Sequence, residues 1–132
     1  MEEENANRKA DLREKMKMEG IRNIAVITGN DAIANADALL DLAMSARYET
    51  GADRLAIEKS MLANDFFILS TRFAGEALQK LINYRFKIAV FGDYSHYTSK
   101  PLKDFMRESN RGRDVFFVAT QEEAIERLEG AE

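Results

Sequence analysis

The sequence predicts a single α/β domain with a mixed, mostly parallel five-stranded sheet and four helices, in the order β-β-α-β-α-β-α-β-α. The chain has 132 residues, which fits one domain. Short apolar runs rich in β-branched residues alternate with segments whose apolar residues recur at helical spacing. The chain contains one proline and no low-complexity stretch, so nothing indicates a linker or a second domain.

The first part of the chain predicts a tail and a hairpin. Residues 1–13 are charged, and we expect a flexible or helical tail ahead of a domain that spans 14–132. Residues 15–19 alternate polar and apolar side chains, which is typical of an edge strand with one wet face, and 19–20 indicate a turn. Residues 24–28 form a buried apolar strand, and the link is too short for a crossover, so the two strands are antiparallel.

The middle of the chain predicts two helices on either side of a strand. Asn35 or Asp37 can cap the first helix, and Gly51 can end it because glycine tolerates the left-handed conformation. Residues 55–57 predict a short buried strand. A long helix is expected from about Asp65 to Tyr84.

The last part of the chain repeats the alternation twice. Residues 87–91 predict a strand, and a helix is expected to begin at Ser99 and to end at Gly112. Residues 115–118 predict the fifth strand. Thr120 has the spacing of a capping box, which predicts the start of the final helix.

Composition excludes several classes of function. The chain has no cysteine, so it cannot form a disulfide, a thiol nucleophile or a zinc–thiolate site. The net charge of −4 argues against nucleic-acid binding. Neither a signal sequence nor an apolar run of membrane-spanning length is visible, so we expect a cytoplasmic protein without a membrane partner. Glycine-rich nucleotide fingerprints and the nucleophile elbow are also missing, and no cofactor is expected.

A set of ordered motifs is spread along the chain. Together they resemble an uncharacterised bacterial family, domain of unknown function 4180, over about residues 14–129, and this resemblance implies no activity. The motifs are Arg47-Tyr48-Glu49-Thr50-Gly51, Asp65-Phe66-Phe67, Ser70-Thr71-Arg72 with Ala74-Gly75-Glu76, Gly92-Asp93-Tyr94-Ser95, Tyr97-Thr98-Ser99-Lys100 with Leu102-Lys103-Asp104-Phe105, and Glu108-Ser109-Asn110.

The order of elements also resembles the STAS domain of anti-sigma-factor antagonists (SpoIIAA-like). That resemblance implies binding to partner proteins and a regulatory serine, for which Ser70 is the candidate. The acidic-Ser-Gly cluster of those domains is absent here. Within the predicted long helix, Ser70 falls near the middle of an apolar stripe. It is either a regulated or pocket-facing hydroxyl, or a small residue beside Ala74 and Ala77 that lets the helix approach the sheet.

The segment 93–99 concentrates polar chemistry between a strand and a helix. Ligands of open α/β sheets bind outside the carboxyl ends of the parallel strands, where this loop is expected. His96 is the only histidine, and Asp93 lies three residues before it. The segment is either a site for a polar ligand or an ordinary loop that caps a helix. The candidate binding residues here are Tyr94, Ser95, Tyr97, Ser99 and Lys100.

A second polar segment follows the strand at 55–57. Glu58, Lys59 and Ser60 are expected at the same sheet edge as Asp93, if both strands are parallel. Glu58 and Asp93 are either two separate loop carboxylates or joint ligands of a divalent cation. No spacing motif supports the cation, so no metal site is predicted.

Two functions follow from these patterns. The first is a non-catalytic regulatory or protein-binding module that self-associates as a homodimer through the first strand or through Ile68, Leu69 and Ile82 outside the core stripe. The alternative is a small ligand-binding protein or enzyme that uses the 93–99 loop. In that version His96 carries a proton and Asp93 orients it. The lack of a catalytic constellation favours the first.

Overall fold

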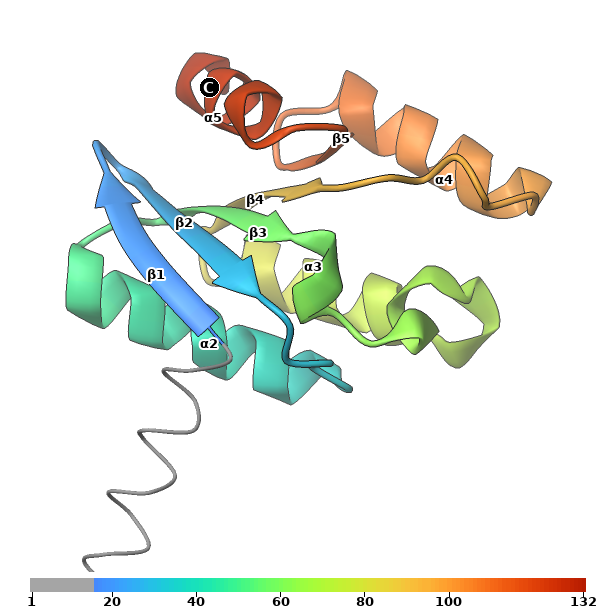
Figure 1. Ribbon diagram of the computed structural model, residues 1–132, viewed down its shortest axis with the longest axis horizontal. Coiled ribbons are helices and arrows are strands. Elements are labelled where there is room, and N and C mark those ends of the chain that lie inside the picture. The colour runs from blue at the N-terminus through green and yellow to red at the C-terminus, as the bar shows by residue number, and fades with distance from the viewer. Residues whose placement is uncertain (1–15) are drawn as a thin grey trace, which may run out of the picture.

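Five strands and four α-helices make up residues 16–132, which are the residues that the computed structural model describes (Figure 1). The predicted tail and positions 14–15 lie outside the described residues. The elements are β1 (Met16–Ile21), β2 (Ile24–Gly29), α2 (Ala36–Thr50), β3 (Arg54–Glu58), α3 (Phe73–Asn83), β4 (Lys87–Phe91), α4 (Lys100–Arg111), β5 (Val115–Val118) and α5 (Gln121–Gly130).

The five strands form one sheet in the order β1-β2-β3-β4-β5. β1 is antiparallel to β2, and each later strand is parallel to its predecessor. The predicted mixed sheet with a leading hairpin is therefore confirmed. Because the parallel strands follow one another in sequence order, all four carboxyl ends meet at one edge of the sheet.

The helices cover the two sides of the sheet unequally. Apolar residues of α2, α3 and α4 pack into one large core cluster with one side of the strands. α5 contributes Ala124 and Leu128 to a smaller cluster on the other side. Figure 1 shows α2 and α3 below the sheet and α5 above it. The side of the sheet that a strand residue faces alternates along β3: Leu55 and Ile57 join the large cluster, and Ala56 the small one.

The turn of the hairpin lies three residues beyond its predicted place. β1 continues through Gly20 to Ile21, and the chain turns at Arg22, whose φ is 56°. Gly20 instead allows a close approach, since a Cβ there would lie 3.3 Å from the Cβ of Thr50 in α2. The prediction of a turn at 19–20 was wrong because glycine also marks close packing.

The predicted long helix from Asp65 to Tyr84 is also wrong at its start. Three short 3₁₀ turns, η1 (Lys59–Met61), η2 (Asn64–Phe67) and η3 (Leu69–Thr71), precede α3, which begins only at Phe73. The hydroxyl of Thr71 lies 2.7 Å from the carbonyl oxygen of Asp65 and 2.8 Å from that of Ile68, so it competes with helical hydrogen bonds. Arg72 then adopts φ 65°.

This break relocates Ser70. The serine lies in η3 and is exposed, rather than inside a helix on an apolar stripe. The buried side chains of this region are Phe66, Phe67 and Phe73, whose rings contact one another with Phe66 at the centre. Both phenylalanines of η2 are thus buried in the core, although they are adjacent in sequence.

The other predicted helix boundaries are confirmed. Asn35, Ser99 and Thr120 each accept a hydrogen bond from a backbone N–H in the first turn of α2, α4 and α5, respectively. Gly51 ends α2 with φ 77°, and Gly112 follows α4.

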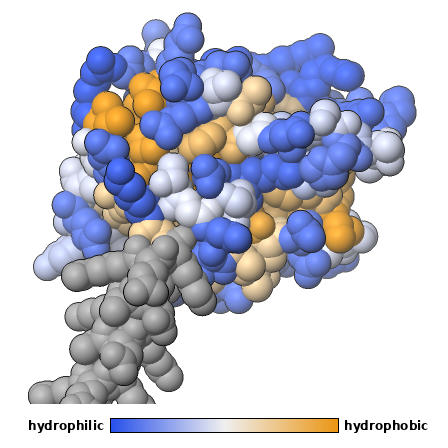
Figure 2. Space-filling model, in the orientation of Figure 1, coloured by the Kyte–Doolittle hydropathy of each residue, from blue (hydrophilic) through white to orange (hydrophobic). Residues whose placement is uncertain are grey.

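The surface in Figure 2 is mostly hydrophilic, with a hydrophobic patch at the end of the molecule where β1 turns into β2. Ile21 is half-buried there. Among the described helices, none combines the length and the apolarity needed to cross a bilayer.

Candidate functional site

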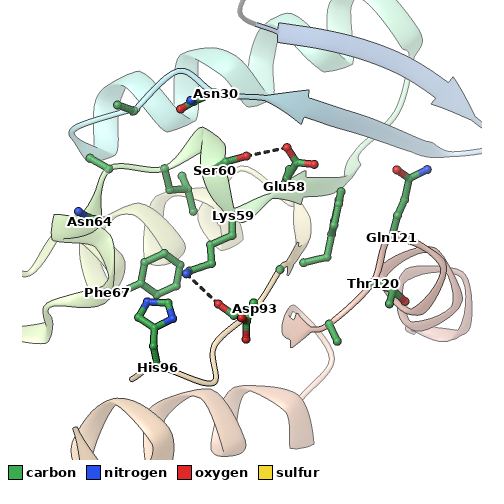
Figure 3. Close-up of a pocket in the computed structure, with 16 residues that line it drawn as sticks. Asn30, Glu58, Lys59, Ser60, Asn64, Phe67, Asp93, His96, Thr120 and Gln121 are labelled. Atoms are coloured by element: carbon green, nitrogen blue, oxygen red, sulfur yellow. Dashed lines mark hydrogen bonds between the residues drawn. The ribbon is translucent and has the colours of Figure 1, made fainter. Parts of the chain in front are cut away.

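An open cleft of about 890 Å³ lies at the edge of the sheet where the parallel strands end (Figure 3). Segments that follow β2, β3, β4 and β5 all contribute to it, so residues far apart in sequence come together. The lining residues are Asn30, Ala32, Glu58, Lys59, Ser60, Leu62, Ala63, Asn64, Phe67, Phe91, Gly92, Asp93, His96, Ala119, Thr120 and Gln121.

The path of the chain explains why the cleft opens here. After β4 the chain leads to α4, which packs with α2 and α3 on one side of the sheet. After the neighbouring strand β5 it leads to α5, which packs on the opposite side. The two connections therefore diverge, and a crevice is left between them, which is where open α/β sheets bind ligands.

Glu58 is held at the end of β3 by a small hydrogen-bond network. One carboxylate oxygen lies 2.7 Å from the hydroxyl of Ser60 and 3.4 Å from the backbone N–H of Gly29, which donates to it. The same hydroxyl lies 2.5 Å from the carbonyl oxygen of Gly29. A hydroxyl has one proton and donates to one acceptor at a time. The other Glu58 oxygen forms no hydrogen bond within residues 16–132, which leaves it available to a ligand.

Lys59 connects the loops after β3 and β4. Its Nζ donates a hydrogen bond to the backbone carbonyl of Asp93 at 2.9 Å. The same Nζ lies 4.7 Å from the ring centre of Tyr97, and 5.6 Å and 5.7 Å from those of Phe67 and Tyr94. A cation at such distances is attracted to aromatic faces. Lys59 therefore fixes the position of the 93–97 loop rather than pointing freely at a ligand.

Gly92 makes this contact possible. A Cβ atom at position 92 would lie 2.7 Å from the Cβ of Lys59, closer than side-chain atoms pack. The neighbouring Lys59 Cβ is near the backbone and cannot swing away. Only glycine therefore fits beside Lys59 without a shift of one of the two loops.

Asp93 begins the loop after β4. One carboxylate oxygen accepts the backbone N–H of Ser95 at 2.8 Å. Hydrogen bonds from Ser95 lower the pKa of Asp93, and the electrostatic effect of His96 and Lys59 lowers it further, so the carboxylate is ionised at neutral pH. Among the described residues, Ser95 alone donates hydrogen bonds to this carboxylate. Glu58 and Asp93 thus both line the same cleft.

His96 lines the cleft and is exposed to solvent. Its ring centre lies 4.3 Å from that of Tyr97, whose ring in turn stacks on Phe67 at 5.3 Å. No hydrogen bond joins His96 to Asp93 in the described part of the chain. The proton-carrier role with Asp93 as orienting group stays a prediction.

The remaining predicted binding residues of this segment do not line the cleft. The hydroxyl of Tyr94 donates to the carbonyl of Val90 at 2.7 Å, and burial raises the pKa of this phenol. Tyr97 stacks on Phe67, and Ser95 supports Asp93. Ser99 caps α4, and Lys100 pairs with Asp104 at 3.0 Å. These side chains shape or support the loop, and they do not face the cleft.

Several lining residues were not predicted. Glu58 and Asp93 were predicted because ligands bind outside the carboxyl ends of parallel strands. The same reasoning applies to the residues after β2 and β5, so it could have indicated Asn30, Thr120 and Gln121. Phe67 had no such signal, because it was placed in a helix that does not exist there, and Asn64 precedes that predicted helix. They reach the cleft through η2.

The charges of the lining are unbalanced. Glu58 and Asp93 contribute two carboxylates, and Lys59 contributes one ammonium that is already engaged. No group of three or more histidine, cysteine, aspartate or glutamate side chains is placed to hold a metal ion anywhere in residues 16–132. The site is therefore suited to hydrogen-bond donors on a ligand more than to anions.

A family model described as "Domain of unknown function (DUF4180)" matches residues 18–128. No curated protein and no solved structure matches the chain. The likeness to STAS domains therefore rests on the order of elements alone.

Proposed function

The chain belongs to the DUF4180 family, and we propose that it binds a small polar organic molecule in the cleft at the carboxyl edge of the sheet. The ligand carries hydroxyl or amino donors and no net negative charge, as sugars, amino sugars and nucleosides do. The observation that carries the proposal is the pair of carboxylates, Glu58 and Asp93, which line the cleft together and each accept a hydrogen bond from a neighbouring serine.

The fixed geometry of the two acids supports binding. One oxygen of each carboxylate accepts a hydrogen bond from a neighbour, Ser60 or Ser95, so the carboxylate is held in place before a ligand arrives. Hydrogen bonds that involve an ionised acceptor are about twice as strong as neutral ones. Pre-organised acceptors also avoid the ordering cost that a mobile side chain would incur on binding.

The apolar part of the lining supports a ligand with a flat or weakly polar face. Phe67 and His96 present rings on one side of the cleft, as Figure 3 shows. Side-chain amides of Asn30, Asn64 and Gln121 can both donate and accept. Rings with a few convergent polar groups are the usual composition of small-molecule sites.

A protein-binding regulatory role of STAS-like shape is the second candidate. Ile68 and Ile82, which were predicted to lie off the core, are 49% and 38% exposed, and large exposed apolar side chains favour contact with a partner. Leu69 is half-buried beside Ile68, and Ser70 is exposed in the same η3 segment. The cleft carries more specific geometry than this surface, so ligand binding is the stronger proposal.

The proposal is tested by calorimetric titration of the protein with adenosine, glucose and glucosamine, and with their phosphorylated counterparts adenosine monophosphate, glucose phosphate and glucosamine phosphate. At least one uncharged or cationic compound is expected to bind, and its phosphate ester is expected to bind more weakly because of the two carboxylates. Glu58→Gln and Asp93→Asn should each weaken the binding about tenfold or more, since each removes a charge-assisted hydrogen bond.

Matched controls lie outside the cleft. Glu108→Gln in α4 and Asp41→Asn in α2 remove the same charge from exposed positions and should leave the affinity unchanged. Binding that is equally weakened by the controls, or preferential binding of the phosphate esters, would overturn the proposal.

A further inference from the structure

The two edge strands of the sheet, β1 and β5, differ in whether their outward-facing backbone groups have hydrogen-bond partners. At β5, the backbone groups of Asp114 and Val118 bond to β4, so those of Phe117 point away from the sheet. The side chain of Asn110 satisfies both of them: it accepts the N–H of Phe117 at 2.6 Å and donates to its carbonyl oxygen at 3.0 Å. This edge is therefore closed to another strand at that point.

The opposite edge has no such cover in the described residues. β1 is the terminal strand, and among residues 16–132 only β2 pairs with it. An edge strand with unpaired N–H and C=O groups is a template for another strand. We propose that β1 pairs antiparallel with β1 of a second copy of this chain, about a two-fold axis perpendicular to the sheet, so that one sheet runs through both copies.

The charges along β1 select one register for this pairing. In such a sheet, residues that lie opposite each other project their side chains from the same face. The two-fold axis must therefore pass beside one residue of β1 and not between two residues. An axis beside Lys17 sets two lysines opposite each other, and an axis beside Glu19 sets two glutamates opposite each other. An axis beside Met18 sets Lys17 of each copy opposite Glu19 of the other. Only this register pairs unlike charges.

The other face of β1 supports the same register. Met16 and Met18 are half-buried and pack against the large core cluster, whereas Lys17 and Glu19 are exposed. With the axis beside Met18, the two Met18 side chains lie opposite each other, and Met16 lies opposite Gly20 of the second copy. The half-buried methionines thereby gain cover.

A single edge lysine can instead keep other strands away. The exposed glutamate two residues later argues against that role here, because it supplies the complementary charge at the place that the symmetric register requires. This inference concerns β1 alone and is independent of the cleft.

The test is the molar mass of the full chain, measured by light scattering and by analytical ultracentrifugation over a range of concentrations. We expect a dimer that dissociates on dilution. Lys17→Glu should weaken the dimer at least about tenfold, because it turns two attractive pairs into two repulsive ones, and Glu19→Lys should do the same. The double variant Lys17→Glu with Glu19→Lys restores unlike pairs and should recover the dimer.

The control Lys103→Glu reverses an exposed charge on α4, far from β1 in the fold, and should leave the dimer intact. Circular dichroism and melting temperature show that each variant is folded, which is expected because the changed side chains are exposed. A wild-type mass of one chain at every concentration overturns the inference. So does a dimer that survives both single reversals, or a double variant that stays monomeric.

Discussion

The side chain of Lys59 packs closely against the backbone of Gly92 in the cleft. The Nζ of Lys59 bonds to the loop after β4, and the missing Cβ of Gly92 provides the space for the stem of that lysine. Neither residue has to touch a ligand for the site to depend on it. The pair keeps the segment with Asp93 beside the segment with Glu58.

Gly92→Ala should destabilise the protein by about 1–3 kcal/mol, because the new Cβ would overlap the Cβ of Lys59. The free energy of unfolding from chemical denaturation measures the effect. Gly75→Ala is the matched control: its Cβ would enter open space in α3, and we expect it to stabilise the helix by about 0.5–1 kcal/mol. An unchanged stability of Gly92→Ala would contradict the close contact.

The lowered pKa of Asp93 gives the loop a defined pH dependence. A carboxyl whose pKa is lower in the folded state than in the unfolded state stabilises the fold above its unfolded pKa, and this contribution is lost as the pH falls through the folded pKa. The hydrogen bonds from Ser95 are the main cause. The melting temperature of the wild type minus that of Asp93→Asn should be constant from neutral pH to about pH 5 and should shrink below about pH 4. A difference that grows on acidification would contradict this sign.

Sequence reasoning predicted five of the residues that line the cleft: Glu58, Lys59, Ser60, Asp93 and His96. They could be predicted because polar residues after apolar strands collect at one sheet edge. The role of Tyr94 could not, since a tyrosine hydroxyl that is buried against its own strand looks the same in sequence as one that faces a ligand.

At the scale of elements, Asn110 shows how a side chain can replace a missing strand. Its amide forms both hydrogen bonds that a neighbouring strand would offer Phe117. The residue lies at the end of α4, so it also connects that helix to β5.

Asn110→Ala should therefore cost about 1–3 kcal/mol of stability, because it leaves a backbone donor and acceptor unsatisfied on a half-buried edge. Urea denaturation measures the change. Asn83→Ala, which removes only a surface bond to Gln79, should stay within about 0.5 kcal/mol of the wild type. Equal effects for both variants would refute the bridging role of Asn110.

The sequence predicted best those elements that local residue chemistry determines. Strands and capped helices were predicted to within a few residues, since β-branched runs and capping side chains act locally. The start of α3 was missed, because the apolar spacing from Phe66 onward fits a helix. The hydroxyl of Thr71 and the left-handed conformation of Arg72 break that helix. The spacing of apolar residues in the sequence reveals neither of them.

At the scale of the whole molecule, the cleft results from the divergence of two connections. Alternating strands and helices predicted the mixed sheet. They did not predict that α4 and α5 pack on opposite sides of it, since the side that a helix covers depends on tertiary packing. That arrangement opens the space between the segments after β4 and β5 and exposes the two carboxylates to it.

The central claim is that this cleft is where the protein binds its ligand. The most direct test is a two-dimensional ¹H–¹⁵N NMR titration with whichever of adenosine, glucose or glucosamine binds in calorimetry. The account predicts that amide signals of residues 58–64, 92–96 and 119–121 shift together with one affinity, while those of β1 and of Ile82 stay in place. Shifts confined to η3, α3 or β1, or no shift with any of the three compounds, would contradict it.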